Sequence, residues 1–255
     1  MGTTFPVVFV PGGVNPARVT YGELLRALGD RVRPVVKDHE LYAGDAPPPG
    51  WTLGTEVEAI RKAADAAGLE TFHLVGYSGG GAISLEFVLA HGDRLRSLTL
   101  IEPAWIGNSG WSPEEVRYWA EEERSSALAG PDFMMNFVRL ALKPGVTFSP
   151  PPGPTPEWMK KRPKGLRAFM AAFKAGNLDV GRLREFRRPV YLPYGDQSAV
   201  VEVIKQERLA GIFPDARIDC YEGTHHFAPP QRLQPDRFAK ALLDLWSRAD
   251  AMTGS

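Results

Sequence analysis

The segment 76–80, Gly-Tyr-Ser-Gly-Gly, is where this sequence could do chemistry. It follows the apolar run 72–75, which is typical of a short buried strand, and precedes residues 79–91, whose apolar side chains recur at helical spacing. A serine between glycines at a strand-to-helix turn sits in a tight corner that exposes its hydroxyl. We therefore expect Ser78 to be a nucleophile if a base lies within reach, rather than only a cap of the following helix.

A histidine is the base that such a serine needs. Three of the five histidines have adequate structural explanations beside strands or at a helix end: His39, His73 and His91. The other two, His225 and His226, lie in the segment 222–230, between the last predicted strand and the last predicted helix. Loops at the carboxyl ends of parallel strands are where such sheets carry their chemistry, so we expect the base there.

The elements that must position these groups alternate along the chain. Apolar runs predict strands at 7–10, 33–36, 72–75, 98–101, 190–192 and 216–221. Between and after them, helical spacing and capping residues predict helices at 20–28, 53–67, 79–91, 200–212 and 238–246. Strands that alternate with helices imply parallel pairing, so we expect one α/β fold with a mostly parallel central sheet flanked by helices.

Residues 103–187 differ in character from the rest of the chain. They contain helical stretches broken by a proline-rich run at 149–156. We therefore predict a core formed by residues 1–102 and 188–255, with a helical cap inserted at 103–187. This insertion is rich in large apolar side chains that pack the cap or line a pocket: Trp105, Trp111, Trp119, Phe133, Met134, Met135, Phe137, Trp158, Phe169, Met170 and Phe173.

Three features together resemble the α/β-hydrolase superfamily: Pro11-Gly12-Gly13 after the first strand, the 76–80 segment and the late loop histidine. The resemblance covers residues 5–246 except for 103–187, which corresponds to that superfamily's variable cap. It places His226 rather than His225 in the catalytic position, because Phe-Ala-Pro-Pro follows His226. It also implies that the backbone amides of Gly79 and Gly13 stabilise an oxyanion.

The acid that orients the histidine is where this sequence departs from the superfamily. Members commonly place an aspartate three residues after the glycine that ends the next-to-last strand, but here that position is Ser198. Asp196 stands two residues earlier and would need a re-routed loop. Glu102 ends the strand after the nucleophile helix, a position from which some members take their acid, and its long side chain could reach His226. We favour Glu102 and keep Asp196 as the alternative.

Composition excludes several classes of function. Thirty basic and 30 acidic side chains give zero formal charge, so we expect no nucleic-acid or anionic-membrane partner. The single cysteine, Cys220, excludes an internal disulfide and a cysteine metal cluster, and its neighbours predict a buried thiol. We expect no metal, no cofactor, no secretion signal at the amino terminus and no membrane span, hence a cytoplasmic protein. The sequence leaves the oligomeric state open, a homodimer included.

These observations predict a serine hydrolase that cleaves a carboxylic ester or lactone with an apolar moiety. Ser78, His226 and Glu102 would form the triad, and Trp105, Tyr77 and Val14 would contact the substrate. Hydrolysis of carbon–carbon bonds or thioesters and cofactor-free perhydrolysis remain alternatives on the same fold. A ligand-binding protein without turnover is the alternative from another class, and the missing aspartate at Ser198 is the one feature that favours it.

Overall fold

Six parallel strands form one sheet in the order β2-β1-β3-β4-β5-β6. The computed structural model describes residues 4–149 and 153–253. The strands are β1 (Phe5–Val10), β2 (Val32–Val36), β3 (Phe72–Tyr77), β4 (Leu95–Ile101), β5 (Val190–Gly195) and β6 (Ala216–Tyr221). This confirms the predicted fold class. Because all six strands run the same way, their carboxyl ends share one edge of the sheet, where Ser78, Glu102 and Asp196 each follow a strand.

Both faces of the sheet are covered, which explains the apolar runs of the central strands. Successive residues of β1 point to opposite faces: Val8 and Val10 join one core cluster, while Val7 and Phe9 join the other. The first cluster lies beneath α2 (Leu53–Ala66), α3 (Gly79–His91) and α8 (Val200–Ile212). The second lies beneath α1 (Ala17–Leu28) and α10 (Pro235–Thr253). The short helix α9 (Pro230–Leu233) precedes α10.

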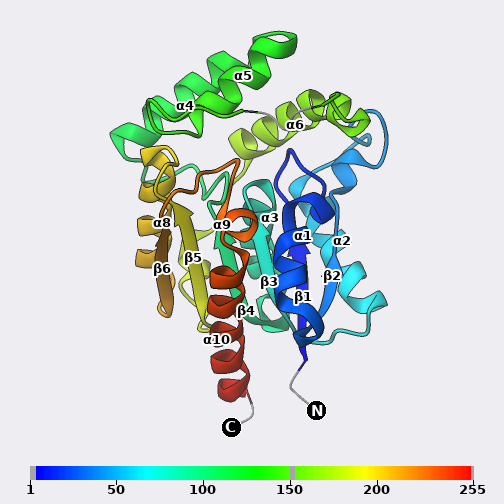
Figure 1. Ribbon diagram of the computed structural model, residues 1–255. Coiled ribbons are helices and arrows are strands. Elements are labelled where there is room, and N and C mark those ends of the chain that lie inside the picture. The colour runs from blue at the N-terminus through cyan, green and yellow to red at the C-terminus, as the bar shows by residue number, and fades with distance from the viewer. Residues whose placement is uncertain (1–3, 150–152, 254–255) are drawn as a thin grey trace.

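The segment between β4 and β5 is helical. It contains α4 (Pro113–Ser126), α5 (Gly130–Leu140), α6 (Arg162–Ala175) and the short α7 (Val180–Leu183). In Figure 1, α4, α5 and α6 lie across the edge of the sheet where the strands end, on the side away from both chain termini. We refer to residues 103–187 as the insertion. Of the predicted proline-rich run, residues 150–152 lie outside the described residues.

Local sequence signals locate most elements within a few residues. Thr52 begins α2 with a capping box, and α8 and β6 have the predicted bounds. The helix predicted from a capping box at Thr20 is correct in kind but begins at Ala17, after Pro16. Thr20 is buried inside this helix, where its hydroxyl donates to the carbonyl of Pro16 (3.0 Å) instead of capping.

The prediction of a buried Cys220 is wrong, because its side chain is exposed. Cys220 lies on β6, an edge strand of the sheet, and most residues of that strand are only partly covered. An apolar neighbourhood in sequence does not distinguish a central strand from an edge strand. Among residues 4–149 and 153–253, no helix combines the length and the apolar composition needed to cross a bilayer.

Candidate active site

Ser78 occupies the sharp turn between β3 and α3. Its backbone has φ 53° and ψ −117°, a left-handed conformation that is strained for a residue with a side chain. Two glycines make the turn possible by their lack of a side chain. A Cβ on Gly76 would lie 2.6 Å from the carbonyl oxygen of Gly80, and one on Gly80 would lie 2.8 Å from the carbonyl carbon of Val10. The expected strained serine corner is therefore present.

Ser78 and His226 are joined by a hydrogen bond across 148 positions of the chain. The Oγ of Ser78 lies 3.0 Å from Nε2 of His226, and Nδ1 of His226 lies 2.8 Å from Oε2 of Glu102. A carboxylate can only accept, so Nδ1 carries the proton and Nε2 is left to accept from the serine. This is the tautomer that a general base for Ser78 requires.

Glu102 is completely buried at the end of β4, in a left-handed conformation with φ 42°. Its Oε1 accepts from the amide of Gly195 (2.7 Å) and from the hydroxyl of Ser198 (2.6 Å). Burial raises the pKa of Glu102, but hydrogen bonds and charge from His226, with those from Gly195 and Ser198, outweigh it and hold the pKa below its usual value. Glu102 therefore stays ionised beside the histidine.

Ser198 is a site residue that the sequence analysis missed as a contributor. It stands where the superfamily commonly has its acid, and here it donates a hydrogen bond to Glu102. The missed signal was the pair itself, a small hydroxyl at the usual acid position together with a glutamate at the end of the neighbouring strand. The two residues fit together, because the carboxylate of Glu102 occupies the space that an aspartate side chain at position 198 would enter.

The two alternatives weighed from the sequence lie elsewhere. Asp196 is half-buried, and its Oδ1 accepts from the amide of Gly223 (2.8 Å), so it ties the loop after β5 to the loop after β6. His225 accepts from the amide of Phe227 through Nδ1 (3.2 Å). Burial lowers the pKa of His225. Both side chains hold the histidine loop in shape, while the contact with Ser78 comes from His226.

Gly13 and Gly79 lie close to each other near the serine. A Cβ on Gly79 would come 3.5 Å from the amide nitrogen of Gly13. The loop that carries Gly13 is fixed by two side chains from the segment after β2. His39 Nε2 bonds to the carbonyl of Pro11 (2.8 Å), and the hydroxyl of Tyr42 donates to the carbonyl of Gly13 (2.6 Å). A preorganised pair of amides is what stabilises a developing oxyanion.

The insertion closes this space with apolar side chains of α6. A Cβ on Gly13 would lie 2.8 Å from Leu166 and 3.5 Å from Phe169, and one on Gly79 would lie 3.4 Å from Phe169. Phe169 is 2% exposed and makes edge contacts with Trp51 and His39, both at 5.3 Å between ring centroids. The aromatic composition of 103–187 predicted such a contact, but it did not single out this ring.

The predicted substrate contacts have three different settings. Tyr77 is buried, its hydroxyl donates to the carbonyl of His226, and its ring lies 5.3 Å from the imidazole. Trp105 is fully buried, stacked on Phe173 at 5.7 Å, and donates to Asn108 (2.8 Å). Val14 is half-buried and packs on an apolar cluster that includes the residue after His226. Tyr77 supports the histidine, Trp105 packs the insertion, and their substrate contacts stay predictions.

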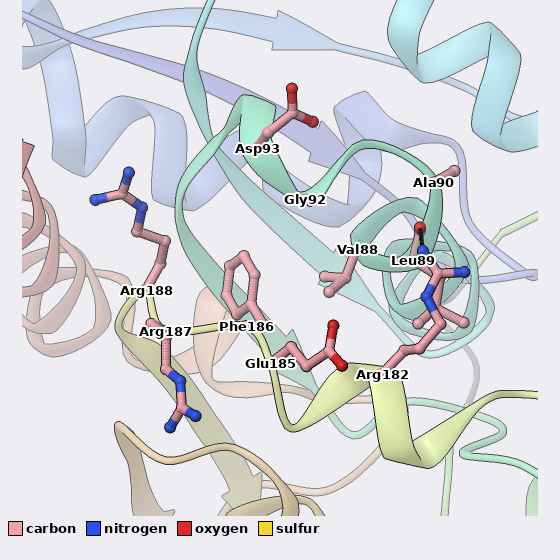
Figure 2. Close-up of a pocket in the computed structure, with 10 residues that line it drawn as sticks. All are labelled: Val88, Leu89, Ala90, Gly92, Asp93, Arg182, Glu185, Phe186, Arg187 and Arg188. Carbon is pink, nitrogen blue, oxygen red and sulfur yellow. Dashed lines mark hydrogen bonds between the residues drawn. The ribbon is translucent and has the colours of Figure 1, made fainter.

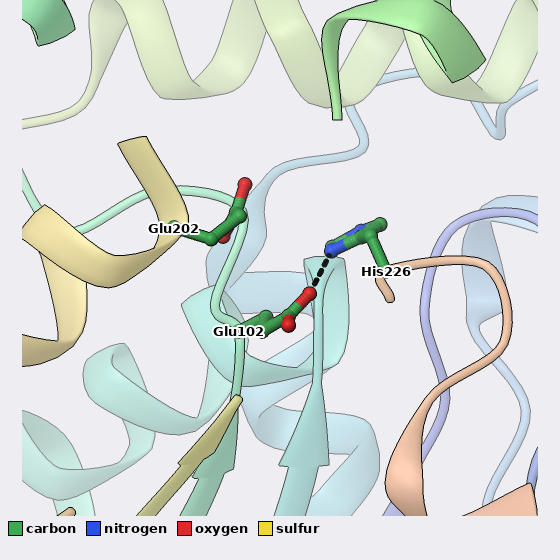
Figure 3. Close-up of side chains that lie close together, drawn as sticks. All are labelled: Glu102, Glu202 and His226. Carbon is green, nitrogen blue, oxygen red and sulfur yellow. Dashed lines mark hydrogen bonds and ion pairs between the residues drawn. The ribbon is translucent and has the colours of Figure 1, made fainter. Parts of the chain in front are cut away.

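A second carboxylate, Glu202, lies beside the triad on α8. One oxygen of Glu102, one oxygen of Glu202 and one ring nitrogen of His226 lie within 4.8 Å of one another. Figure 3 shows the three side chains close together. These potential metal ligands have other partners, however. Glu102 and His226 bond to each other, and the ammonium of Lys205 lies 2.9 Å from Glu202. The arrangement fits an ion pair next to a hydrogen bond better than it fits a cation site.

A surface depression lies at the other end of α3 (Figure 2), lined by Val88, Leu89, Ala90, Gly92, Asp93, Arg182, Glu185, Phe186, Arg187 and Arg188. Its arginines do not converge on one point. Arg182 donates to the carbonyl of Leu89 (2.8 Å), and Arg187 and Arg188 extend in different directions. The depression is lined by none of the residues discussed above as site residues.

Comparison with known proteins places these observations in context. A family model described as "Alpha/beta hydrolase family" matches residues 7–241. A protein of Caulobacter vibrioides named "Putative carbamate hydrolase RutD" is 31% identical over 93% of this chain and 88% of its own length. A Comamonas testosteroni protein named "2-hydroxy-6-oxo-6-phenylhexa-2,4-dienoate hydrolase" is 25% identical over 73% of this chain and 66% of its own. The esterase structure from Exiguobacterium antarcticum matches 97% of this chain and 93% of its own with a TM-score of 0.73 at 18% identity, which indicates a shared fold.

Proposed function

Because this chain belongs to the alpha/beta hydrolase family, we propose that it is a serine hydrolase that cleaves a carboxylic ester or lactone with an apolar moiety through an acyl-enzyme. One observation carries the proposal, the hydrogen-bonded chain from Ser78 through His226 to Glu102, with distances of 3.0 and 2.8 Å. These two hydrogen bonds favour an enzyme over a ligand-binding protein without turnover.

In the proposed reaction, Ser78 Oγ attacks the carbonyl carbon while its proton passes to Nε2 of His226. The negative charge that develops on the carbonyl oxygen is stabilised by the amides of Gly79 and Gly13. Glu102 stabilises the imidazolium, which then gives its proton to the leaving alcohol. Water enters, His226 takes a proton from it, and the resulting attack releases the acid and restores Ser78.

The apolar preference rests on what surrounds these groups. Leu166 and Phe169 lie against the two glycines from the insertion, and Val14 lies in an apolar cluster with Phe227 beside His226. A substrate carbonyl held at the glycine amides would meet apolar walls on the insertion side. The proposal includes a small-molecule substrate and a cytoplasmic location. It leaves the oligomeric state open, a homodimer included.

Carbamate hydrolysis is a second candidate. It is favoured by the name of a relative that is 31% identical over 93% of this chain. A carbamate presents the same carbonyl carbon to Ser78 and needs the same oxyanion amides, so the triad geometry fits both substrates. The difference lies in the leaving group and in what the walls of the pocket accept.

The test has two steps. A fluorophosphonate probe should label the chain covalently at Ser78, and the Ser78→Ala variant should not be labelled. A panel of nitrophenyl esters of increasing acyl length, lactones and nitrophenyl carbamates then identifies the substrate class, and we expect esters or lactones to be turned over fastest. An unlabelled, folded protein that turns over no member of the panel would overturn the proposal, and faster turnover of carbamates would favour the second candidate.

A further inference from the structure

A buried carboxylate beside the triad has no part in the reaction described above. Glu202 lies in the first turn of α8 and is 1% exposed. Its carboxylate lies within 4.8 Å of both a carboxylate oxygen of Glu102 and a ring nitrogen of His226. Figure 3 shows the three side chains approaching one another from α8, the end of β4 and the loop after β6. Two carboxylates therefore face one imidazole where water is excluded.

Lys205, one turn further along α8, is the counter-ion of Glu202. It is also 1% exposed. Its ammonium donates to Oε1 of Glu202 at 3.0 Å and lies 2.9 Å from Oε2. It donates further to the carbonyl of Pro103 at 2.8 Å, directly after Glu102 in the chain. Lys205 thus ties the second carboxylate to the backbone that carries the triad acid.

Charge balance gives this arrangement a consequence for catalysis. Two carboxylates that share a buried site cannot both stay ionised without a compensating cation, because each raises the pKa of the other. Burial and the charge of Glu102 hold the pKa of Glu202 above its usual value, and the charges of Lys205 and His226 limit the rise. The positive charge of Lys205 offsets the charge of Glu202. Glu102 can then stay ionised, as His226 requires.

Other titratable groups also face this region. Arg232 donates to the carbonyl of Phe227 (3.3 Å), and its positive charge opposes the rise in the pKa of Tyr77. The neutral ring of Tyr77 lies against His226 from β3, and His225 adjoins it in its own loop. From α4, Tyr118 and Glu122 face Lys205, with the Tyr118 ring 5.9 Å from its ammonium. Burial raises the pKa of Glu122 to about 7, so this carboxyl group is neutral below that pH and adds a negative charge near Lys205 above it.

We propose that Glu202 and Lys205 are a charge-balancing pair that positions the triad and sets the pH dependence of the attack by Ser78. The inference rests on the proposed serine hydrolase function. Neither residue touches the reacting atoms, so both act through Glu102 and His226. A pair that only joined α8 to the end of β4 would affect stability but not the pH dependence.

The experiment measures the rate of fluorophosphonate labelling of Ser78 against pH in three variants. Glu202→Gln leaves Lys205 uncompensated and disfavours the imidazolium, so the acid limb should move about one unit to lower pH and labelling should slow about tenfold. Lys205→Met removes the compensating cation, so Glu202 takes up a proton more readily. The negative charge that Glu202 retains favours the imidazolium, so the acid limb should move to higher pH by less than about one unit. The double variant removes both charges and should return the midpoint and most of the rate to those of the parent.

A control ion pair also involves α8. Arg208 of α8 forms an ion pair with the buried Glu115 of α4. The double variant Glu115→Gln/Arg208→Met should lower the melting temperature and leave the midpoint of labelling unchanged. This control separates the loss of a buried ion pair from the loss of charge balance at the triad.

Three outcomes would overturn the inference: folded single variants with the parent midpoint, single variants that shift in the same direction, or a double variant slower than either single variant. Should Lys205→Met fail to fold, the shift in Glu202→Gln and its reversal in the double variant decide the question. Absence of labelling in the parent chain would instead count against the proposed function.

Discussion

At the scale of single residues, the notable feature is the way the acid is held. Glu102 leaves its strand in a left-handed conformation and bonds to His226 with one oxygen, while the other accepts from Gly195 and Ser198. Both oxygens of this buried carboxylate are therefore hydrogen-bonded, one to the histidine and the other to the end of β5 and the loop that follows it. A group held in this way is ionised and fixed in direction, as the base requires.

The Glu102→Gln variant should lower kcat by about 10³- to 10⁴-fold, because the amide keeps the shape but loses the charge and can hold the wrong tautomer of His226. Steady-state hydrolysis of the best ester from the panel measures the effect. Asp196→Asn is the matched control, since Asp196 bonds to the Gly223 amide, and it should retain kcat within a few-fold. A crippled Asp196→Asn with an active Glu102→Gln would reverse the assignment of the acid.

At the scale of elements, the loop after β1 is shaped by the segment 37–42 and by α2. Glu56 of α2 is 2% exposed, lies 3.6 Å from Nδ1 of His39, and accepts from Trp51 (2.7 Å) and from the amide of Leu41 (2.8 Å). His39 in turn bonds to the carbonyl of Pro11. The buried carboxylate of Glu56 thereby fixes the segment that holds the loop carrying Pro11 and Gly13.

Glu56 should make stability depend on pH. Burial raises its pKa, but the contacts with His39, Trp51 and Leu41 outweigh burial and lower the pKa to about 2. Since the folded pKa is below the unfolded one, the stabilisation is present above pH ~4.5 and is lost as pH falls towards 2. Urea denaturation should show that Glu56→Gln costs about 3 kcal/mol at pH 7 and progressively less below pH ~4.5.

Glu58→Gln supplies the comparison from the same helix. The Glu58 side chain is 47% exposed and pairs with Arg61 at the surface. Its replacement should change the free energy of unfolding little at any pH, because exposed pairs contribute little. Equal losses for the two variants, or a loss in Glu56→Gln that does not depend on pH, would contradict the role given to Glu56.

At the scale of the whole molecule, the insertion and the core meet over the nucleophile. Arg162 at the start of α6 lies over the ring of Tyr42 at 3.8 Å, and Tyr42 donates to the carbonyl of Gly13. Leu166 and Phe169 then follow on the same helix and contact Gly13. In the proposed reaction, the distance between α6 and the amides of Gly13 and Gly79 would limit the size of the group that can bind there.

Phe169→Ala should widen this space. We expect a loss of about 3–5 kcal/mol in stability, typical for a buried phenylalanine, together with a shift of ester preference towards longer or bulkier acyl groups. Phe173→Ala is the control, because Phe173 is buried in the same helix and stacks on both Trp105 and Phe169, whereas Phe169 is the ring that lies against Gly13 and Gly79. It should lower stability and leave the preference for chain length unchanged. An unchanged preference in Phe169→Ala would remove Phe169 from the pocket.

The sequence by itself determined the class of fold, the strained serine turn and the candidates for base and acid. These follow from short-range signals: apolar periodicity marks strands and helices, and glycines around Ser78 are needed by one backbone turn. Only the tertiary structure decided which carboxylate meets His226, what Ser198 does, and that Glu202 with Lys205 stands beside them. The hydrogen bonds of Glu102 to His226 and Ser198 join residues 124 and 96 positions apart, and side-chain reach across neighbouring strand ends is not encoded in any local pattern.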